Sequence, residues 1–211
     1  MPATSHRGVT RQDVAQAAAD LVAAEGFEAL SVRRVAHRLE VWPTTVTHHA
    51  GGRRDGLIPL LIEHLAAGIS TDLHGSWRTR LAELGANIRR VALTHRGLAD
   101  IVLRSGATGP QSLRLADAIL GALEDAGLDP DDAQDAYDDF LTYVLGSAGR
   151  QTTATAPARW QGFVKALDHA DPGTYPVLRR AARSGTARDD DARFSGGLEL
   201  VLEGIAQRAS R

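Results

Sequence analysis

The chain has 211 residues, of which 24 are basic and 26 acidic, so its formal net charge is -2. It contains no Cys, which excludes disulfides and thiolate metal sites, and it has no apolar run long enough to cross a membrane. Residues 1–30 lack the continuous apolar segment of a signal peptide, and alternating β-branched runs are few. These features predict an all-α, soluble protein of the cytoplasm.

The first predicted helix begins after Thr10. Thr10 and Asp13 have the spacing of a capping box, in which the two side chains satisfy backbone N–H groups of the first turn. Gly26 is expected to end this helix, since glycine commonly follows a last helical turn. One face of the helix is apolar and is expected to be buried; it consists of Val14, Ala18, Leu21 and Val22.

Residues 31–50 predict a helix-turn-helix. Apolar residues recur at helical spacing from Val32 to Leu39, and Ser31 before them is a good N-cap. Residues 40–42 interrupt this pattern, and Pro43 then suits the first turn of a second short helix. Two short helices separated by three residues are typical of a helix-turn-helix. The alternative is a solvated helical hairpin in an all-α protein.

The second of these helices has a surface suited to DNA. No acid occurs from residue 41 to residue 54, and residues 1–57 carry a small basic excess, whereas the remainder is acidic overall. Hydroxyl, imidazole and indole groups can contact base edges and phosphate oxygens in a major groove. The side chains expected on the outside are Trp42, Thr44, Thr45, Thr47, His48 and His49.

Beyond the head, apolar periodicity predicts a further series of helices. They are expected at residues 57–69, 77–95, 98–104 and 111–126, from residue 130 onward, and at 160–167, 175–182 and 194–205. The segments 105–110, 152–157 and 183–191 are predicted as loops or linkers. An acidic run at residues 131–139 is interpreted as a solvated face, the alternative being a cation site.

Residues 10–57 resemble the DNA-binding domain of the TetR family of transcriptional repressors. The resemblance rests on Glu25-Gly26-Phe27, Leu30-Ser31-Val32, Val35-Ala36, Leu39, Val41, Thr45-Val46 and His49. Four positions depart from the family pattern: Glu40 replaces the turn glycine, Trp42 a serine, Thr47 the tyrosine that grips phosphate, and Ala50 the apolar residue that follows His49 in the family. The resemblance implies that Ser31 contacts phosphate and that Thr44, Thr45 and His48 face bases. Together with the outward-facing Trp42 and Thr47 and the basic Arg53 and Arg54, these residues form the predicted DNA-binding surface.

The remaining chain resembles the C-terminal domain of the tetracycline-repressor branch of this family, through Trp77, Leu81, His95-Arg96, residues 143–146 and residues 194–205. The resemblance implies a helix-turn-helix domain at 1–57, a ligand-binding and dimerisation domain at 58–211, and a homodimer joined by a four-helix interface. The expected interface residues are Phe140, Val144, Phe194, Leu198, Val201 and Ile205. The alternative is that this apolar stripe packs within one chain.

The resemblance also bears on the ligand. The tetracycline-repressor branch holds Mg²⁺-tetracycline with His, Asn and Gln side chains, and three of those positions are apolar here. Because a buried polar ligand is left without partners at such positions, a hydrophobic effector bound without metal is expected. The predicted lining is Leu84, Ile88, Val102 and Ala118, with His64, Trp77 and His95 as polar edges. The alternative is a packed core without a cavity.

The sequence contains no phosphate-binding glycine loop, HExxH motif or nucleophile elbow, so it predicts neither an enzyme nor a bound cofactor. We therefore expect a ligand-responsive repressor that binds a palindromic double-stranded DNA operator as a dimer and is released by a small hydrophobic effector. The alternative is an all-α small-molecule-binding or interaction protein whose head no longer binds DNA specifically.

Overall fold

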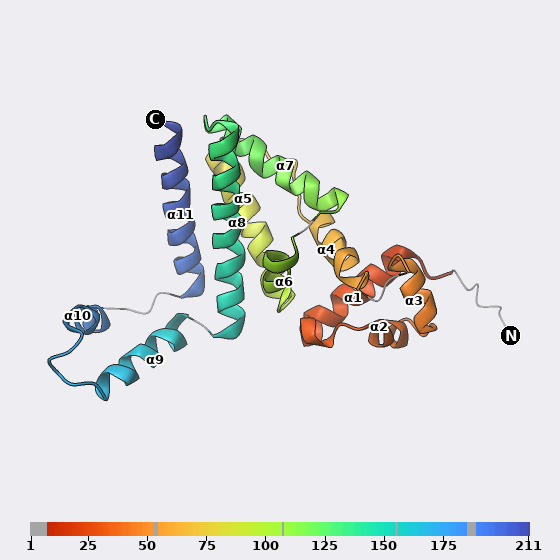
Figure 1. Cartoon of the computed structure of the whole chain (residues 1–211), viewed down its shortest axis with the longest axis horizontal. Helices are drawn as coiled ribbons and strands as arrows, with labels where there is room; N and C mark the ends of the chain where they lie inside the picture. The colour runs from red at the N-terminus through yellow and green to blue at the C-terminus, as the bar shows by residue number, and fades with distance from the viewer. Residues whose placement is uncertain (1–7, 53–54, 107, 155, 185–188) are drawn as a thin grey trace.

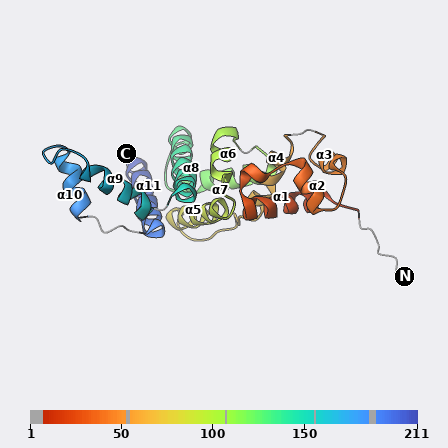
Figure 2. The same cartoon turned by 90° about the horizontal axis from the view of Figure 1, so that it is seen from below.

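The computed structural model describes residues 8–52, 55–106, 108–154, 156–184 and 189–211. Within these residues the protein is built from helices without a β-strand, so the prediction of an all-α fold is confirmed (Figure 1). A small N-terminal head lies at one end of an elongated molecule, and a larger helical body forms its middle (Figures 1 and 2). No helix within the described ranges is long and apolar enough to span a membrane.

The head has the predicted three helices and one additional short turn. Thr10 caps the first helix, and the capping box with Asp13 is formed in full. Gly26 follows the last turn with a φ of 88°. The fully buried side chains of this core include Val14, Val22, Val35 and Val46. The elements are α1 (Arg11–Glu25), the 3₁₀ turn η1 (Phe27–Ala29), α2 (Val32–Arg38) and α3 (Pro43–His49).

The turn between α2 and α3 places Glu40 at a φ of 55°, in the left-handed region. A residue with a Cβ costs about 1 kcal/mol more than glycine in this conformation. The backbone N–H of Val41 donates to the carbonyl of Ala36 at 3.0 Å, which closes the turn despite this cost. The departure at position 40 therefore leaves the helix-turn-helix geometry in place.

Helix α4 (Leu57–Ala67) packs with both parts of the molecule. Leu57, Leu60 and Leu61 are buried in the core of the head. The same helix also packs against α7 of the body, and Ile62 is buried on the body side. The position expected for the domain boundary, after residue 57, therefore lies in the first turn of a helix that packs against both the head and the body.

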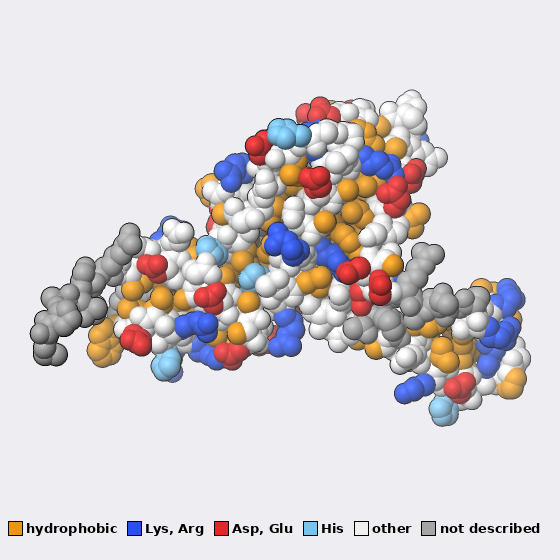
Figure 3. Space-filling view, turned by 180° about the vertical axis from the view of Figure 1, so that it is seen from behind, with side chains coloured by type: hydrophobic (Ala, Val, Ile, Leu, Met, Phe, Trp, Pro, Cys, Tyr) orange, Lys and Arg blue, Asp and Glu red, His pale blue; other side chains and the backbone are white. Residues whose placement is uncertain are grey.

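The body is organised around α8, which packs against α5, α6, α7 and α11 (Figure 2). Its core contains Leu81, Ile119, Leu123 and Leu202, which are at most 1% exposed. Figure 3 shows acidic and basic side chains interspersed over the surface, with hydrophobic side chains reaching it across the middle of the body. The helices are α5 (Trp77–Thr94), α6 (Leu98–Ser105), α7 (Pro110–Asp125), α8 (Pro130–Thr153) and α11 (Asp190–Ala209).

Two predicted boundaries near the C-terminus are wrong. Helix α8 continues to Thr153, where a linker was expected, and the next helix begins at Ala156. Helix α11 begins at Asp190, four residues before the expected start, because the side chain of Asp189 accepts a hydrogen bond from the N–H of Ala192 at 2.7 Å. Between them α9 (Ala156–Asp168) and α10 (Pro176–Ser184) project away from the body (Figure 1).

Candidate functional site

The outer surface of α3 presents four side chains without a structural role in the head. Trp42 is 80% exposed at the start of the helix, and Thr44 and His48 are also exposed, while Thr45 is half-buried. Thr47 differs from them, because its hydroxyl donates to the carbonyl of Pro43 at 3.1 Å within the helix. The chemistry of this surface is therefore that of one indole, two hydroxyls and one imidazole.

Ser31 has a structural role in addition to its predicted contact with phosphate. Its hydroxyl oxygen accepts a hydrogen bond from the N–H of Arg34 at 3.3 Å and so caps α2. Arg34 in turn donates to Glu25 at 2.5 Å, which ties α2 to the end of α1. The two predicted DNA contacts Arg53 and Arg54 lie outside the described residues.

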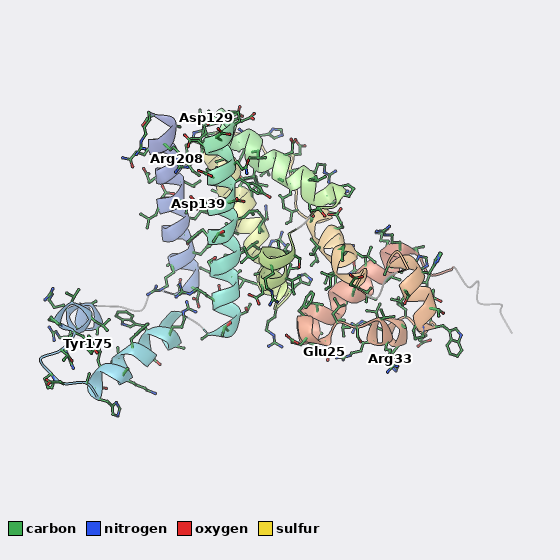
Figure 4. All side chains as sticks on the ribbon, viewed as in Figure 1. Glu25, Arg33, Asp129, Asp139, Tyr175 and Arg208 are labelled. Carbon is green, nitrogen blue, oxygen red and sulfur yellow. The ribbon has the colours of Figure 1, made fainter. Side chains whose placement is uncertain are left out.

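Two further basic side chains on the head were not predicted as DNA contacts. Arg33 and Arg38 are exposed on α2, and neither forms an ion pair within the described part of the chain. Figure 4 shows Arg33 projecting from the head on the side away from α5 and α11. Free guanidinium groups beside a helix-turn-helix can contact phosphate. The available signal in the sequence was the presence of Arg33, Arg34 and Arg38 within one short helix.

A cavity of about 440 Å³ lies among α4, α5, α6, α7 and α8. Its size falls in the range of small-molecule sites. Two of the predicted lining residues, Ile88 and Val102, contribute to its wall. The described lining is mainly aliphatic and contains no Lys, Arg, His, Asn or Gln; the aliphatic wall includes Ile62, Leu65, Ile69, Val91, Leu98, Leu115, Ile119 and Leu145.

The other predicted ligand contacts lie outside this cavity. Leu84 is 1% exposed in the packed core of the body, and Ala118 packs at the edge of that core. His95 forms a hydrogen bond through Nδ1 with the carbonyl of Val91 at 2.8 Å, at the end of α5. His64 and Trp77 are half-buried on other faces of their helices. These five residues therefore do not line this cavity. They were predicted from the resemblance, which aligns positions along each helix but does not fix the direction in which each side chain faces.

The polar groups of the cavity come from residues that the sequence analysis did not predict. Tyr137, Asp138 and Thr142 lie on one stripe of α8, and Ser112 lies in the first turn of α7. Burial raises the pKa of the Tyr137 phenol, and the negative charge of Asp138 raises it further. The phenol therefore stays protonated near neutral pH and can donate a hydrogen bond.

Glu63 joins α4 to the wall of this cavity. Its carboxylate accepts hydrogen bonds from the N–H groups of Gln111 and Ser112, at 2.8 and 3.0 Å, and from the hydroxyl of Ser112 at 2.5 Å. Burial raises the pKa of Glu63, but these hydrogen bonds outweigh it and the net pKa is lowered. A Cβ at Gly109 would collide with the Glu63 side chain, so glycine permits this approach. The carboxylate thus caps α7 from another helix.

A second connection between head and body lies at the end of α1. The N–H of Phe27 donates to the carbonyl of Arg96 at 2.9 Å, and the guanidinium of Arg96 donates to the carbonyl of Glu25 at 3.1 Å. Gly97, at a φ of 92°, has room for no Cβ, because that atom would lie 2.7 Å from Cβ of Phe27. An open cleft of about 610 Å³ adjoins this junction. Within the described residues the head therefore contacts the body through this junction as well as through α4.

Most of the residues expected at a dimer interface lie inside the chain. Phe140 and Val144 are fully buried, and Phe194, Leu198 and Ile205 are at most 7% exposed. Their side chains face the body's own core, as in the alternative of a stripe that packs within one chain, and they leave little surface for a second copy. Of the predicted set, Val201 alone keeps partial exposure.

The outer face of α11 instead carries the exposed apolar surface. Leu200 is 74% exposed on this face. It borders a groove of about 350 Å³ between α8 and α11, where Asp139 and Arg208 can be followed in Figure 4. The groove is lined by Ala136, Asp139, Leu200, Val201, Gly204, Ile205 and Arg208.

Comparison with known proteins agrees with this architecture. The sequence model of the family described as "Tetracyclin repressor-like, C-terminal domain" matches residues 71–209. The chain is 26% identical to an HTH-type transcriptional regulator of Saccharopolyspora erythraea, over 95% of this chain and 86% of the relative. It is 29% identical to the class C tetracycline repressor protein of Escherichia coli, over 92% and 90% of the two chains.

A solved structure gives the same result in three dimensions. The structure of the TetR family protein ActR of Streptomyces coelicolor in complex with actinorhodin superposes with a TM-score of 0.83 and 26% sequence identity. The match covers 97% of this chain and all of ActR. These relatives are regulators of transcription rather than enzymes. The chain therefore belongs to the TetR family of transcriptional regulators, with a helix-turn-helix head and a tetracycline-repressor-like C-terminal domain.

Proposed function

We propose that this protein is a ligand-responsive repressor that binds a palindromic DNA operator as a homodimer and releases it when a small hydrophobic molecule fills the cavity. The position of α4 carries the proposal. Leu57 and Leu61 of this helix lie in the core of the head, whereas Ile62 and Ala66 line the cavity. A bound molecule therefore contacts the helix that holds the head.

This arrangement supports a linkage between the two sites. The protein can adopt one head orientation that binds DNA and another that does not. An effector that binds the second orientation more tightly weakens operator binding, at most by the ratio of its affinities for the two orientations. The Glu63 cap on α7 and the contact of Phe27 with Arg96 are the other attachments through which a change in the body can reach the head. Domain assignment follows the same division, with a DNA-binding head at 1–57 and an effector-binding and dimerisation body at 58–211.

On the DNA, we assign base contacts to Trp42, Thr44, Thr45 and His48 of α3, and phosphate contacts to Ser31. Arg53 and Arg54 remain proposed phosphate contacts from the sequence. Paired heads of a symmetric dimer read two half-sites separated by about one helical turn or a multiple of it. We place this activity in the cytoplasm, as expected for a regulator that acts on chromosomal DNA.

For the dimer, we propose the outer groove of α8 and α11 as the contact between subunits. Leu200 and Val201 supply its apolar surface. The space beside Gly204 is open in this chain, and glycine presents no Cβ to a second helix there. Asp139 and Arg208 flank the groove with opposite charges. In a two-fold arrangement such charges can face each other across the interface.

The test is selection of bound sequences from a pool of random DNA duplexes. The expected result is a two-fold symmetric consensus, bound with an affinity that falls steeply as salt rises. Thr45→Ala and His48→Ala should each change the preferred base at one position of the half-site, at a cost of roughly 1–3 kcal/mol. Enrichment of no sequence at low salt would contradict the proposal and favour the alternative of a binding protein with an inactive head.

A further inference from the structure

Among the described residues that line the cavity between α4 and α8, one side chain is acidic and none is basic. Asp138 is exposed on α8 and is the sole charged residue of the described lining. It forms no ion pair in the described part of the chain. Glu63, the other carboxylate close to this wall, is already occupied by its hydrogen bonds to the first turn of α7.

The sequence around this carboxylate keeps the local field negative. Residues 130–149 of α8 contain five Asp and no Lys, Arg or His. Arg208 of α11 approaches Asp132 and Asp135, at 3.7 and 3.9 Å, and none of the described cavity residues supplies a positive charge. An anionic ligand in the cavity therefore meets a like charge without a cationic partner, and a neutral ligand leaves the carboxylate unused.

We propose that this cavity takes a molecule with an apolar body and a protonated amine, whose ammonium group pairs with the Asp138 carboxylate at the cavity's edge. The aliphatic wall accommodates the body, and the phenol of Tyr137 with the hydroxyl of Thr142 adds acceptors beside the ammonium. This inference rests on the proposed effector site and adds the charge of the ligand that the site selects.

A matched set of fluorescent probes tests the charge preference: anthracenylmethylamine, anthracenylmethanol and anthracenecarboxylic acid share one ring system and differ in charge at pH 7.5. Fluorescence titration of the full chain should show the amine binding about fivefold more tightly than the alcohol, with the acid weakest, as expected for a partly exposed ion pair. The advantage of the amine should decrease as salt is added, since salt screens exposed charges.

The paired variants are Asp138→Asn and Asp117→Asn. Asp117 is an exposed acid on α7 that does not line the cavity. In Asp138→Asn the three probes should bind within about twofold of one another, whereas Asp117→Asn should keep the order of the unmodified protein. Both substitutions preserve side-chain size at exposed positions, so folding is expected to be unaffected.

The outcomes separate this inference from the proposed function. Equal binding of amine and acid, or an order that persists in Asp138→Asn, would overturn the charge preference while leaving an apolar effector site intact. Failure of all three probes to bind would overturn this inference together with the assignment of the cavity as an effector site. The operator selection described above is independent of either result.

Discussion

Removing the Glu63 carboxylate should destabilise the contact between α4 and α7. In Glu63→Ala the N–H groups of Gln111 and Ser112 and the Ser112 hydroxyl lose their acceptor. Ser112 is only 7% exposed, so water replaces that acceptor poorly. Loss of a helix cap costs about 0.5–2 kcal/mol, and an unpaired buried donor about 1–3 kcal/mol. Because Gln111 is more accessible, we expect a total near 2 kcal/mol.

Thermal unfolding at one protein concentration is the assay. For a chain of this length, about 2 kcal/mol corresponds to a melting temperature lower by about 4–8 °C. Glu63→Gln keeps one acceptor oxygen without the charge and should lose roughly half as much. The matched control is Glu83→Ala, which removes an exposed carboxylate from α5 that makes no hydrogen bond or ion pair in the described residues.

The dependence on pH provides a second measurement. The pKa of folded Glu63 lies below its ordinary value of 4.5, so its contribution is complete above that pH and is lost as the pH falls through the folded pKa. The difference in melting temperature between the unmodified protein and Glu63→Ala should therefore shrink below about pH 4.5. A melting temperature of Glu63→Ala equal to that of Glu83→Ala at neutral pH would refute the cap.

Three further predictions concern DNA, assembly and ligand. Trp42→Ala should weaken operator binding by roughly 1–3 kcal/mol in mobility shifts, with an unchanged melting temperature because the indole is 80% exposed; unaltered affinity would remove Trp42 from the DNA surface. Leu200→Glu should give monomers by light scattering and abolish operator binding, whereas Leu113→Glu, an exposed leucine on α7, should leave dimers; dimers in both would move the interface elsewhere. Mg²⁺-tetracycline should show no micromolar binding by calorimetry, because the described cavity wall lacks His, Asn and Gln, and tight binding would contradict this assignment.

The sequence predicted those elements whose signals are local. Thr10 and Ser31 each cap the helix that follows them, as predicted from their side-chain chemistry. Local spacing likewise predicted the helix-turn-helix, and the resemblance identified Glu40 as the turn residue, whose φ is 55°. Such features depend on residues within one or two turns of each other, so no knowledge of the tertiary packing was needed.

Features that depend on the rotation of a helix were not predictable in the same way. The apolar stripe of α11 has a period that fits burial against any neighbour, and the structure turns Leu198 inward and Leu200 outward. Glu63 and Ser112 are 49 residues apart and meet only through the packing of α4 on α7. Of the seven predicted ligand contacts, Ile88 and Val102 line the cavity and the other five do not. The helices of the wall were predicted, but the direction in which each helix turns its side chains was not.

Helix α8, which is about 36 Å long, contributes to the cavity on one side and to the outer groove on the opposite side. Asp138 and Thr142 face the cavity, while Ala136 and Asp139 border the groove beside α11. Substitutions that change ligand preference can therefore accumulate along one side without altering the shape of the other. For biosensor engineering, this separation makes positions 138 and 142 suitable sites for randomised libraries, since the outer groove stays unmodified in every library member.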